Sequence, residues 1–186
     1  MGTLKIKDKE FSIFITAGDI QKTVSGIAAK LVRDLDGKNP LFLVVLNGSF
    51  MFASDLFKLC NILCDISFVK LSSYRGTGTT GNVKTLIGLS ENIKGRTVVI
   101  IEDIVDTGHT IGNIVEHLKR QNPAEIKICT MLFKPDAYKM NIKLDYVGME
   151  IPNDFVVGYG LDYDGFGRNY GDIYKINNSC VGLKSG

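Results

Sequence analysis

The sequence lacks the features that define several whole classes of protein. No stretch of its 186 residues approaches the run of about 20 apolar residues that spans a bilayer. The segment that begins at Met1 lacks the apolar core of a signal peptide. Lys and Arg number 22 against 20 Asp and Glu, so the formal net charge is only +2, and no basic stripe for nucleic acid is evident. We expect no membrane partner, no nucleic-acid partner and a cytoplasmic location.

Residues for several common catalytic and metal sites are also scarce. His109 and His117 are the only histidines, and neither has an evident Ser or Cys partner, so the pattern does not indicate a hydrolase triad. Cys60 and Cys64 lie four apart without a second pair, which does not fit a zinc site. The phosphate-binding pattern G-x-x-x-x-G-K-[ST] is absent from the sequence, so a P-loop kinase has no support.

Apolar runs and helical patterns alternate along the chain. Runs at 41–46, 63–72, 83–89, 97–101 and 125–133 predict strands. Helical spacing predicts helices that begin near residues 16, 50 and 111. This alternation is typical of an α/β fold with a parallel sheet and right-handed crossovers. The length fits one domain, and the glycine-rich remainder from Lys134 is predicted to be an appendage on the sheet.

The strongest motif follows the apolar run that ends at Ile101. Glu102 and Asp103 come first, and Asp106 then leads into the Thr-Gly-His-Thr turn at 107–110. Ligands of open α/β sheets bind at the carboxyl ends of strands. Backbone N–H groups at the following helix N-terminus favour a phosphate, whereas adjacent carboxylates suit sugar hydroxyls or Mg²⁺. The motif therefore indicates a ligand that combines phosphate, sugar and metal, although acids that merely cap the helix are the structural alternative.

A second glycine motif, at 76–81, matches the dinucleotide pattern G-x-G-x-x-G. That pattern needs a strand before it and a helix after it. The run at 83–89 has no helical face, so we predict a flexible lid between two strands instead.

The segment 98–110 resembles the phosphoribosyl-pyrophosphate motif of type I phosphoribosyltransferases. Further segments at 46–50, 72–74, 132–134 and 155–163, followed by Arg168, occur in the order found in hypoxanthine-guanine phosphoribosyltransferases. The resemblance covers about residues 10 to 176. It implies a type I phosphoribosyltransferase fold, with a mainly parallel central sheet flanked by helices. A single domain of residues 1–186 would have a core at about 37–133 and a small hood from the N-terminal segment and about 134–186.

The resemblance implies a purine salvage enzyme. Phosphoribosyl pyrophosphate and hypoxanthine or guanine would give IMP or GMP and pyrophosphate, with Mg²⁺. It also suggests a homodimer or homotetramer.

Site residues are implied in the same way. Asp106 would be the general base or acid near purine N7. The 5′-phosphate would be held by Asp106, Thr107, Gly108, His109 and Thr110. Groups around the purine would be Lys134, Phe155, Val156 and Asp162. Ribose would meet Glu102 and Asp103, the metal ligands would be Glu102, Asp103 and Asp162, and pyrophosphate would meet Gly48 and Arg168. The lid would begin at Ser73 and Tyr74.

Two positions depart from the family pattern. Asn47 stands where many members carry Lys, which removes a positive charge near the expected pyrophosphate. His109 replaces a Lys found in some relatives. Two alternatives stay open: a regulator that senses phosphoribosyl pyrophosphate and binds nucleic acid, and an enzyme for adenine or xanthine. Adenine is disfavoured because the Lys134 ammonium would face its amino donor instead of a 6-oxo acceptor.

Overall fold

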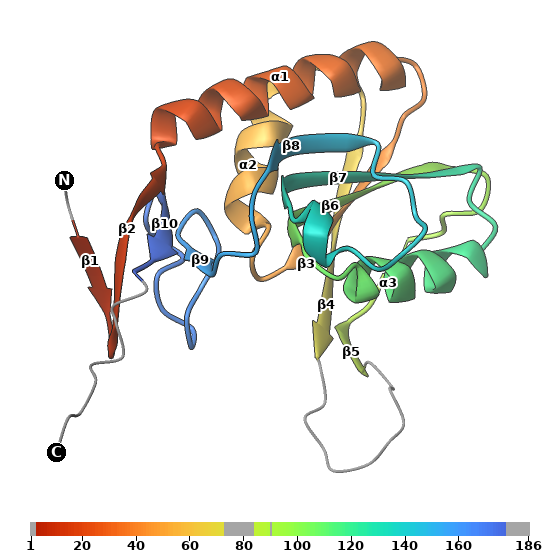
Figure 1. Ribbon diagram of the computed structural model, residues 1–186. Coiled ribbons are helices and arrows are strands. Elements are labelled where there is room, and N and C mark those ends of the chain that lie inside the picture. Colours follow the sequence, from red (N-terminus) through yellow and green to blue (C-terminus); the bar gives the residue numbers. More distant parts are fainter. Residues whose placement is uncertain (1–2, 73–83, 90, 178–186) are drawn as a thin grey trace, which may run out of the picture.

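A six-stranded sheet forms the centre of the computed structural model, in which residues 3–72, 84–89 and 91–177 are described (Figure 1). Its strand order is β5-β4-β3-β6-β7-β8. All neighbours are parallel except β4 and β5, which are antiparallel. The bounds are β3 (Leu41–Leu46), β4 (Asp65–Ser72), β5 (Lys84–Ile87), β6 (Thr97–Val105), β7 (Glu125–Phe133) and β8 (Tyr146–Glu150).

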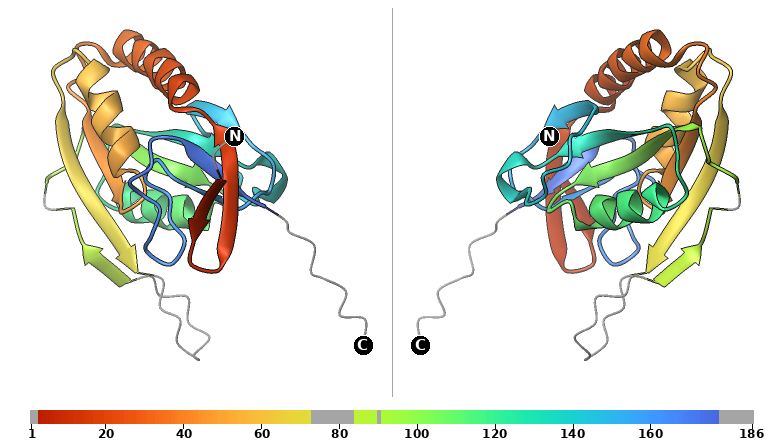
Figure 2. Two further views of the ribbon diagram at one scale, coloured as in Figure 1. Left: turned by 90° about the vertical axis from the view of Figure 1, so that its left-hand side faces the viewer. Right: turned by 90° about the vertical axis from the view of Figure 1, so that its right-hand side faces the viewer.

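Helices cover both faces of this sheet. Helices α1 (Ala17–Leu35) and α2 (Phe50–Leu59) lie on one face, and α3 (His109–Lys119) lies on the other (Figures 1 and 2). Val99 and Ile101 of β6 pack in the same core as α1 and α2, whereas Val98 and Ile100 pack in the core of α3. Alternate residues of a strand face opposite layers, which explains why the run is apolar throughout. The predicted α/β fold is confirmed.

The first helix begins after Thr16, near the position that the helical spacing predicts. Thr16 is the N-cap, and its hydroxyl oxygen accepts a hydrogen bond from the Asp19 amide at 3.2 Å. Thr16 also donates to the Asp19 carboxylate at 2.7 Å, so the acidic residue serves in place of the usual Glu. Asp36 is the C-cap, and Gly37 follows at φ +75°, a conformation that glycine adopts without steric cost.

A second, antiparallel sheet joins the two ends of the described chain. Its order is β1-β2-β10-β9, with β1 (Thr3–Ile6), β2 (Lys9–Ile15), β9 (Val156–Val157) and β10 (Ile173–Ile176). Ile6, Phe11 and Val157 form its small separate core. Figure 2 shows this sheet beside the main one, so terminal segments do build a hood.

The predicted boundary between core and hood differs from the structure. Strand β8 pairs with β7 in the main sheet, although it lies beyond residue 133, and α1 packs on that sheet, although it precedes residue 37. The core therefore extends in both directions. A single short turn of 3-10 helix, Pro135–Ala137, precedes β8.

The strand that carries the acidic motif is also longer than predicted. Strand β6 leaves its partner β3 after Ile101 but continues to pair with β7, from Glu102 opposite Thr130 to Val105 opposite Phe133. Glu102 and Asp103 therefore lie within the strand, so the expectation that the strand ends at these acids was wrong.

Residues 73–83 lie outside the described part of the chain, and with them the predicted lid residues Ser73 and Tyr74 and the glycine motif at 76–81. The flanking elements β4 and β5 are antiparallel neighbours. A strand follows the glycine motif where a dinucleotide site would need a helix. None of the described helices is long and apolar enough to cross a membrane.

Replacement of Leu31 by Ala tests the packing of α1 on the sheet. Leu31 is fully buried, and we expect Leu31→Ala to lower the free energy of unfolding by about 2–5 kcal/mol, because it removes buried methyl groups and leaves a cavity. Lys30→Ala, one residue earlier on the exposed side, should change it by less than about 0.5 kcal/mol. Urea denaturation of both variants checks the difference, and equal effects would contradict this packing.

Candidate active site

The carboxyl ends of three neighbouring parallel strands meet at one edge of the sheet. Asn47–Ser49 follow β3, Asp106–Gly108 follow β6, and Lys134 follows β7. The structure thus brings together sequence-predicted residues that are 86 positions apart, Gly48 and Lys134. This edge is where ligands bind in sheets of this kind.

The turn before α3 forms a small cradle. Gly108 is the N-cap at φ +84°. Among the described residues, Asp103 accepts from the Ile104 amide and Asp106 from Lys134, and neither accepts from a first-turn amide of α3, so the alternative in which these acids merely cap the helix is not supported. A cavity of about 80 Å³ lies here, lined by Glu102, Ile104, Val105, Asp106, Thr107, Gly108, His109, Thr110 and Ile111. First-turn N–H groups and the positive end of the helix dipole face an incoming anion at such a site.

Tyr138 holds this cradle from the far side. A Cβ atom on Gly108 would clash with the Tyr138 ring, so the ring packs directly against the backbone. The Tyr138 hydroxyl donates to the carbonyl oxygen of Ile142 at 2.6 Å, and the Lys139 amide donates to that of Thr107 at 3.2 Å. Sequence reasoning missed Tyr138, because nothing in the local pattern shows that the segment after β7 crosses back over the cradle.

Lys134 and Asp106 form an ion pair beside the cradle. Lys134 Nζ lies 3.1 Å from Asp106 Oδ2. The Lys134 side chain is only 11% exposed, whereas that of Asp106 is 49% exposed. The Lys134 amide also donates to the Val105 carbonyl at 2.9 Å, which fixes the strand end that carries the ammonium group. A buried cation is thus held next to a carboxylate that solvent or a ligand can reach.

Glu102 and Asp103 are adjacent carboxylates, of which Glu102 is buried and Asp103 is partly buried. Glu102 is 6% exposed, and its Oε2 atom has no hydrogen-bond partner among the described residues. Burial raises the pKa of Glu102 well above its ordinary value, and the neighbouring Asp103 charge raises it further. Burial also raises the pKa of Asp103. This pair is suited to a cation or to hydroxyl donors.

Gly48 brings the end of β3 against this acidic pair. A Cβ atom on Gly48 would fall on the Asp103 carboxylate, and one on Gly160 would fall on the Gly48 carbonyl oxygen. The peptide bond between Leu46 and Asn47 is cis. Main sheet and hood therefore meet backbone to backbone, with no room for a side chain at Gly48 or Gly160. Gly160 has no role in the sequence-based prediction, because only the folded chain shows its approach to Gly48.

Arg168 completes this second group. Its Nη1 donates to the Gly160 carbonyl at 2.6 Å, and its Nη2 lies 2.5 Å from Asp162 Oδ1. Both side chains of the ion pair are about one quarter exposed, at 26% for Arg168 and 28% for Asp162. The Arg168 charge also acts on Asp103 by lowering its pKa, although burial is the larger influence on that carboxyl group. The structure therefore gathers Gly48, Asp103, Asp162 and Arg168.

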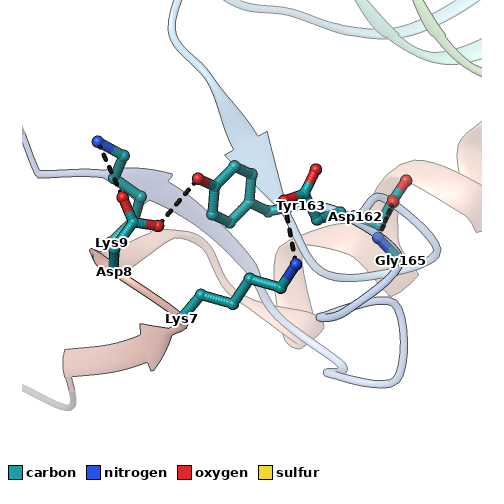
Figure 3. Close-up of polar contacts among 7 residues, drawn as sticks. Lys7, Asp8, Lys9, Asp162, Tyr163 and Gly165 are labelled. Carbon is teal, nitrogen blue, oxygen red and sulfur yellow. Dashed lines mark hydrogen bonds and ion pairs between the residues drawn. The ribbon is translucent and has the colours of Figure 1, made fainter.

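The turn after Asp162 is tied to the hood (Figure 3). Asp162 Oδ2 accepts from the Gly165 amide at 2.7 Å. The Tyr163 hydroxyl donates to Asp8 at 2.9 Å, and Lys7 pairs with Asp164 at 3.0 Å. The turn between β1 and β2 thus contacts the loop that carries Asp162. Such exposed contacts contribute little energy each and act mainly by fixing the loop.

Phe155 and Val156 come from the hood. Phe155 is 45% exposed, and its ring lies edge-on to Tyr163 with 5.9 Å between centroids. Val156 is buried in β9. Phe155 therefore has free aromatic surface, which an ordinary core phenylalanine lacks.

The described residues alone do not provide enough ligands for a metal ion. No group of three carboxylates, histidines or cysteines that could hold a metal occurs among the described residues. Glu102 and Asp103 still offer hard oxygen donors, and Oε2 of Glu102 is free of hydrogen bonds to the described chain. These donors fit Mg²⁺, provided that the substrate supplies further ligands.

The fold and these groups of residues define a phosphoribosyltransferase. Residues 16–164 match the family model of the phosphoribosyl transferase domain, and the chain belongs to this family. The resemblance noted in the sequence is confirmed.

Within this family, the chain is similar to proteins named hypoxanthine or hypoxanthine-guanine phosphoribosyltransferase. A hypoxanthine phosphoribosyltransferase of Haemophilus influenzae is 38% identical over 176 residues, which cover 92% of this chain and 98% of the relative. A hypoxanthine-guanine phosphoribosyltransferase of Mycobacterium tuberculosis is 39% identical over 172 residues, covering 89% of this chain and 84% of the relative. A crystal structure of a hypoxanthine phosphoribosyltransferase from Staphylococcus aureus superposes with a TM-score of 0.84 at 40% identity, covering 89% of this chain and 91% of that chain.

Neutralisation of Glu102 tests the burial of this carboxylate. The pKa of Glu102 is higher in the folded chain than its ordinary value of 4.5, so the protonated carboxyl group favours the folded state. This contribution to the free energy of unfolding is fully present below pH 4.5 and is lost as pH rises through the folded pKa. In metal-free buffer at about pH 8, we expect Glu102→Gln to raise the free energy of unfolding by roughly 1–3 kcal/mol, because glutamine has no carboxyl group whose ionisation opposes folding. The gain should shrink towards about pH 5.

Glu116→Gln is the matched control, since the Glu116 side chain is 69% exposed on α3. It makes the same chemical change without relieving buried charge. Urea denaturation at several pH values compares the two variants. A Glu102→Gln gain that does not vary with pH would contradict the burial argument.

Proposed function

We propose that this chain is a purine salvage enzyme that transfers the 5-phosphoribosyl group from phosphoribosyl pyrophosphate to hypoxanthine or guanine. The products are IMP or GMP and pyrophosphate. The observation that carries the proposal is the Lys134–Asp106 ion pair, which adjoins the phosphate cradle at 106–110. Groups suited to bind a base and groups suited to bind a phosphate thus lie side by side at one edge of the sheet. The names of the relatives, hypoxanthine and hypoxanthine-guanine phosphoribosyltransferases, support the same activity.

Lys134 and Asp106 act on the purine. The Lys134 ammonium donates to the 6-oxo group and thereby rejects adenine, whose amino group is itself a donor. Asp106 takes up or returns the proton at N7, as its exposed carboxylate can reach a ligand. Phe155 stacks on the ring with its exposed face, and the Val156 backbone, with Asp162 nearby, meets the edge of the base.

The remaining groups bind the phosphates. The amides and hydroxyls from Asp106 to Thr110, including His109, hold the 5′-phosphate at the start of α3. Arg168 and the Gly48 backbone meet the pyrophosphate, while Asn47 adds no charge. Negative charge grows on the leaving pyrophosphate as the bond to ribose breaks, and a fixed guanidinium stabilises it.

Glu102 and Asp103 hold the ribose hydroxyls, directly or through Mg²⁺, and Asp162 is a further ligand of the metal. Bound Mg²⁺ supplies positive charge to the pyrophosphate oxygens. The unpartnered Oε2 atom of Glu102 supports this role, because a buried acceptor without a donor is unfavourable until a ligand arrives.

Three further features belong to the proposal. Ser73 and Tyr74 begin a lid that excludes water from the reacting ribose. The enzyme is a homodimer or homotetramer. It works in the cytoplasm.

An assay of nucleotide formation tests the function directly. We expect IMP and GMP from phosphoribosyl pyrophosphate, Mg²⁺ and hypoxanthine or guanine, and no AMP from adenine, because Lys134 cannot accept from an amino group. Ultraviolet difference spectra measure each product, and xanthine completes the panel of bases. If neither hypoxanthine nor guanine is converted, the proposal is wrong.

Asp106→Asn tests the acid–base role. We expect kcat to fall by roughly 10²–10⁴-fold, the usual effect of removing a general acid or base, because an amide cannot exchange the N7 proton. Asp65→Asn is the control, since Asp65 begins β4 and pairs with Arg96 at 2.7 Å, away from the carboxyl edge. Steady-state kinetics of both variants give the comparison. An unchanged kcat for Asp106→Asn would remove this residue from the role.

A further inference from the structure

The loop after β9 has an unusual backbone. Gly158, Tyr159 and Gly160 are consecutive and all have positive φ, at +98°, +48° and +98°. Glycine adopts this region without penalty, but a tyrosine does so only where the surrounding structure holds it. A Cβ atom on Gly158 would clash with the Asp172 carbonyl, and one on Gly160 with the Gly48 carbonyl. The loop is therefore confined between two stretches of backbone, with Tyr159 at its centre.

The Tyr159 side chain explains how this conformation is maintained. Tyr159 is 3% exposed, and its hydroxyl donates to Asp55 Oδ2 on α2 at 2.9 Å. Burial raises the pKa of Tyr159, and the bond to Asp55 raises it further, so the group stays a donor. A buried tyrosine hydroxyl with a charged acceptor makes one of the stronger hydrogen bonds in a protein.

Asp55 is itself fixed on two further sides. It accepts from Gln21 on α1 and from Lys58 on α2, each at 2.8 Å. Burial alone would raise the pKa of Asp55, but the hydrogen bonds from Lys58, Gln21 and Tyr159 outweigh it, so the pKa is lowered. The carboxylate is thus charged and held still, which makes it a firm anchor for the loop.

This anchor lies close in sequence to the groups that meet the pyrophosphate. Gly160 follows Tyr159, and its carbonyl accepts from Arg168 while its amide donates to the Arg168 carbonyl at 2.9 Å. Asp162 follows two residues later and pairs with Arg168. Helix α2, which carries Asp55, begins two residues after Gly48. One hydrogen bond therefore connects the helix behind Gly48 with the loop that carries Asp162 and orients Arg168.

We propose that the Tyr159–Asp55 hydrogen bond is a positioning contact for phosphoribosyl transfer, which sets the orientation of Arg168 and Asp162 opposite Gly48 and so the affinity for the pyrophosphate group. The inference rests on the proposed function of Arg168 and Gly48. Neither Tyr159 nor Asp55 touches substrate. Their effect falls mainly on the pyrophosphate, because the groups proposed for the purine other than Asp162 are held by other contacts. Lys134 and Asp106 are held between the ends of β6 and β7, and Val156 is held by the pairing of β9 with β10.

Tyr159→Phe is the decisive variant, since it removes the hydroxyl and keeps the ring. We expect the KM for phosphoribosyl pyrophosphate, and the KM for pyrophosphate in the reverse reaction, to rise by about tenfold, the change that corresponds to one lost hydrogen bond. The KM for hypoxanthine should change by less than about twofold. A purely structural tyrosine would change both or neither.

Tyr146→Phe is the matched control. Tyr146 is likewise buried, and its hydroxyl bonds to the helical carboxylate of Asp34 at 3.3 Å, but it joins β8 to α1 away from the proposed site. It should leave every KM unchanged. Asp55→Asn is the conservative variant: its amide oxygen can still accept from Tyr159, so its KM for phosphoribosyl pyrophosphate should rise less than that of Tyr159→Phe. Thermal unfolding shows that each variant is folded at the assay temperature.

Arg168→Gln separates failure of this inference from failure of the proposed site. If Arg168→Gln raises the KM for phosphoribosyl pyrophosphate but Tyr159→Phe does not, only the positioning role is wrong. If Arg168→Gln also has no effect, while the wild-type chain still forms IMP, the assignment of the pyrophosphate site is wrong. Equal effects of Tyr159→Phe and Tyr146→Phe would likewise overturn the positioning role. If Tyr159→Phe does not fold, the KM for phosphoribosyl pyrophosphate is measured for Asp55→Asn and Asp55→Ala instead. The inference is overturned if neither variant raises it.

Discussion

The contact of bare backbone at Gly48 is the constraint on which the site depends. Gly48 ends the loop after β3, meets the Asp103 carboxylate of β6 and presents its carbonyl to Gly160 of the hood. Three parts of the chain that are far apart in sequence can approach this closely only because two of them lack side chains. A side chain at Gly48 would displace the Asp103 carboxylate, and one at Gly160 would push the hood away from the Gly48 carbonyl. The close approach of Gly48 and Gly160 therefore comes first, and it brings the charged groups of the site together.

Those charges show a balance between stability and activity. Glu102 is buried with one oxygen unpartnered, and Asp103 lies beside it with its pKa raised by burial. Both features are unfavourable in the folded chain by itself, because the Glu102 oxygen has lost its hydrogen bonds to water and the Asp103 charge is partly desolvated. The continued pairing of β6 with β7 as far as Val105 holds both residues in place nonetheless. The pairing of β6 with β7 thus offsets the unfavourable burial of these two carboxylates. A bound cation or hydroxyl donor would give them the partner that they lack.

Much of this arrangement could be predicted from the order of residues, and the failures have physical reasons. Apolar runs indicated strands such as β3 and β7, and helical spacing indicated the start of α1, because local chemistry decides both. The end of β6 and the place of β8 could not be predicted, since each depends on pairing with β7 rather than on local propensity. Tyr138 and Gly160 escaped notice for the same reason: their importance lies in distant backbone that only the fold brings near.

The pairing of both cations in the free chain explains how a nearly neutral protein can suit a polyanion. The buried Lys134 is paired with Asp106, and the partly exposed Arg168 with Asp162, so neither positive charge lacks a partner. Leaving either cation without a partner would be unfavourable. A phosphate can replace the Asp162 carboxylate as the anionic partner of Arg168, and the neutral 6-oxo oxygen can accept a hydrogen bond from Lys134 in place of Asp106. The released Asp106 and Asp162 are the very groups proposed to act on the purine proton and on the metal, so ligand binding and the freeing of these acids would be a single event. A net charge of +2 is then sufficient, because recognition depends on exchange between local partners and not on the field of the whole protein.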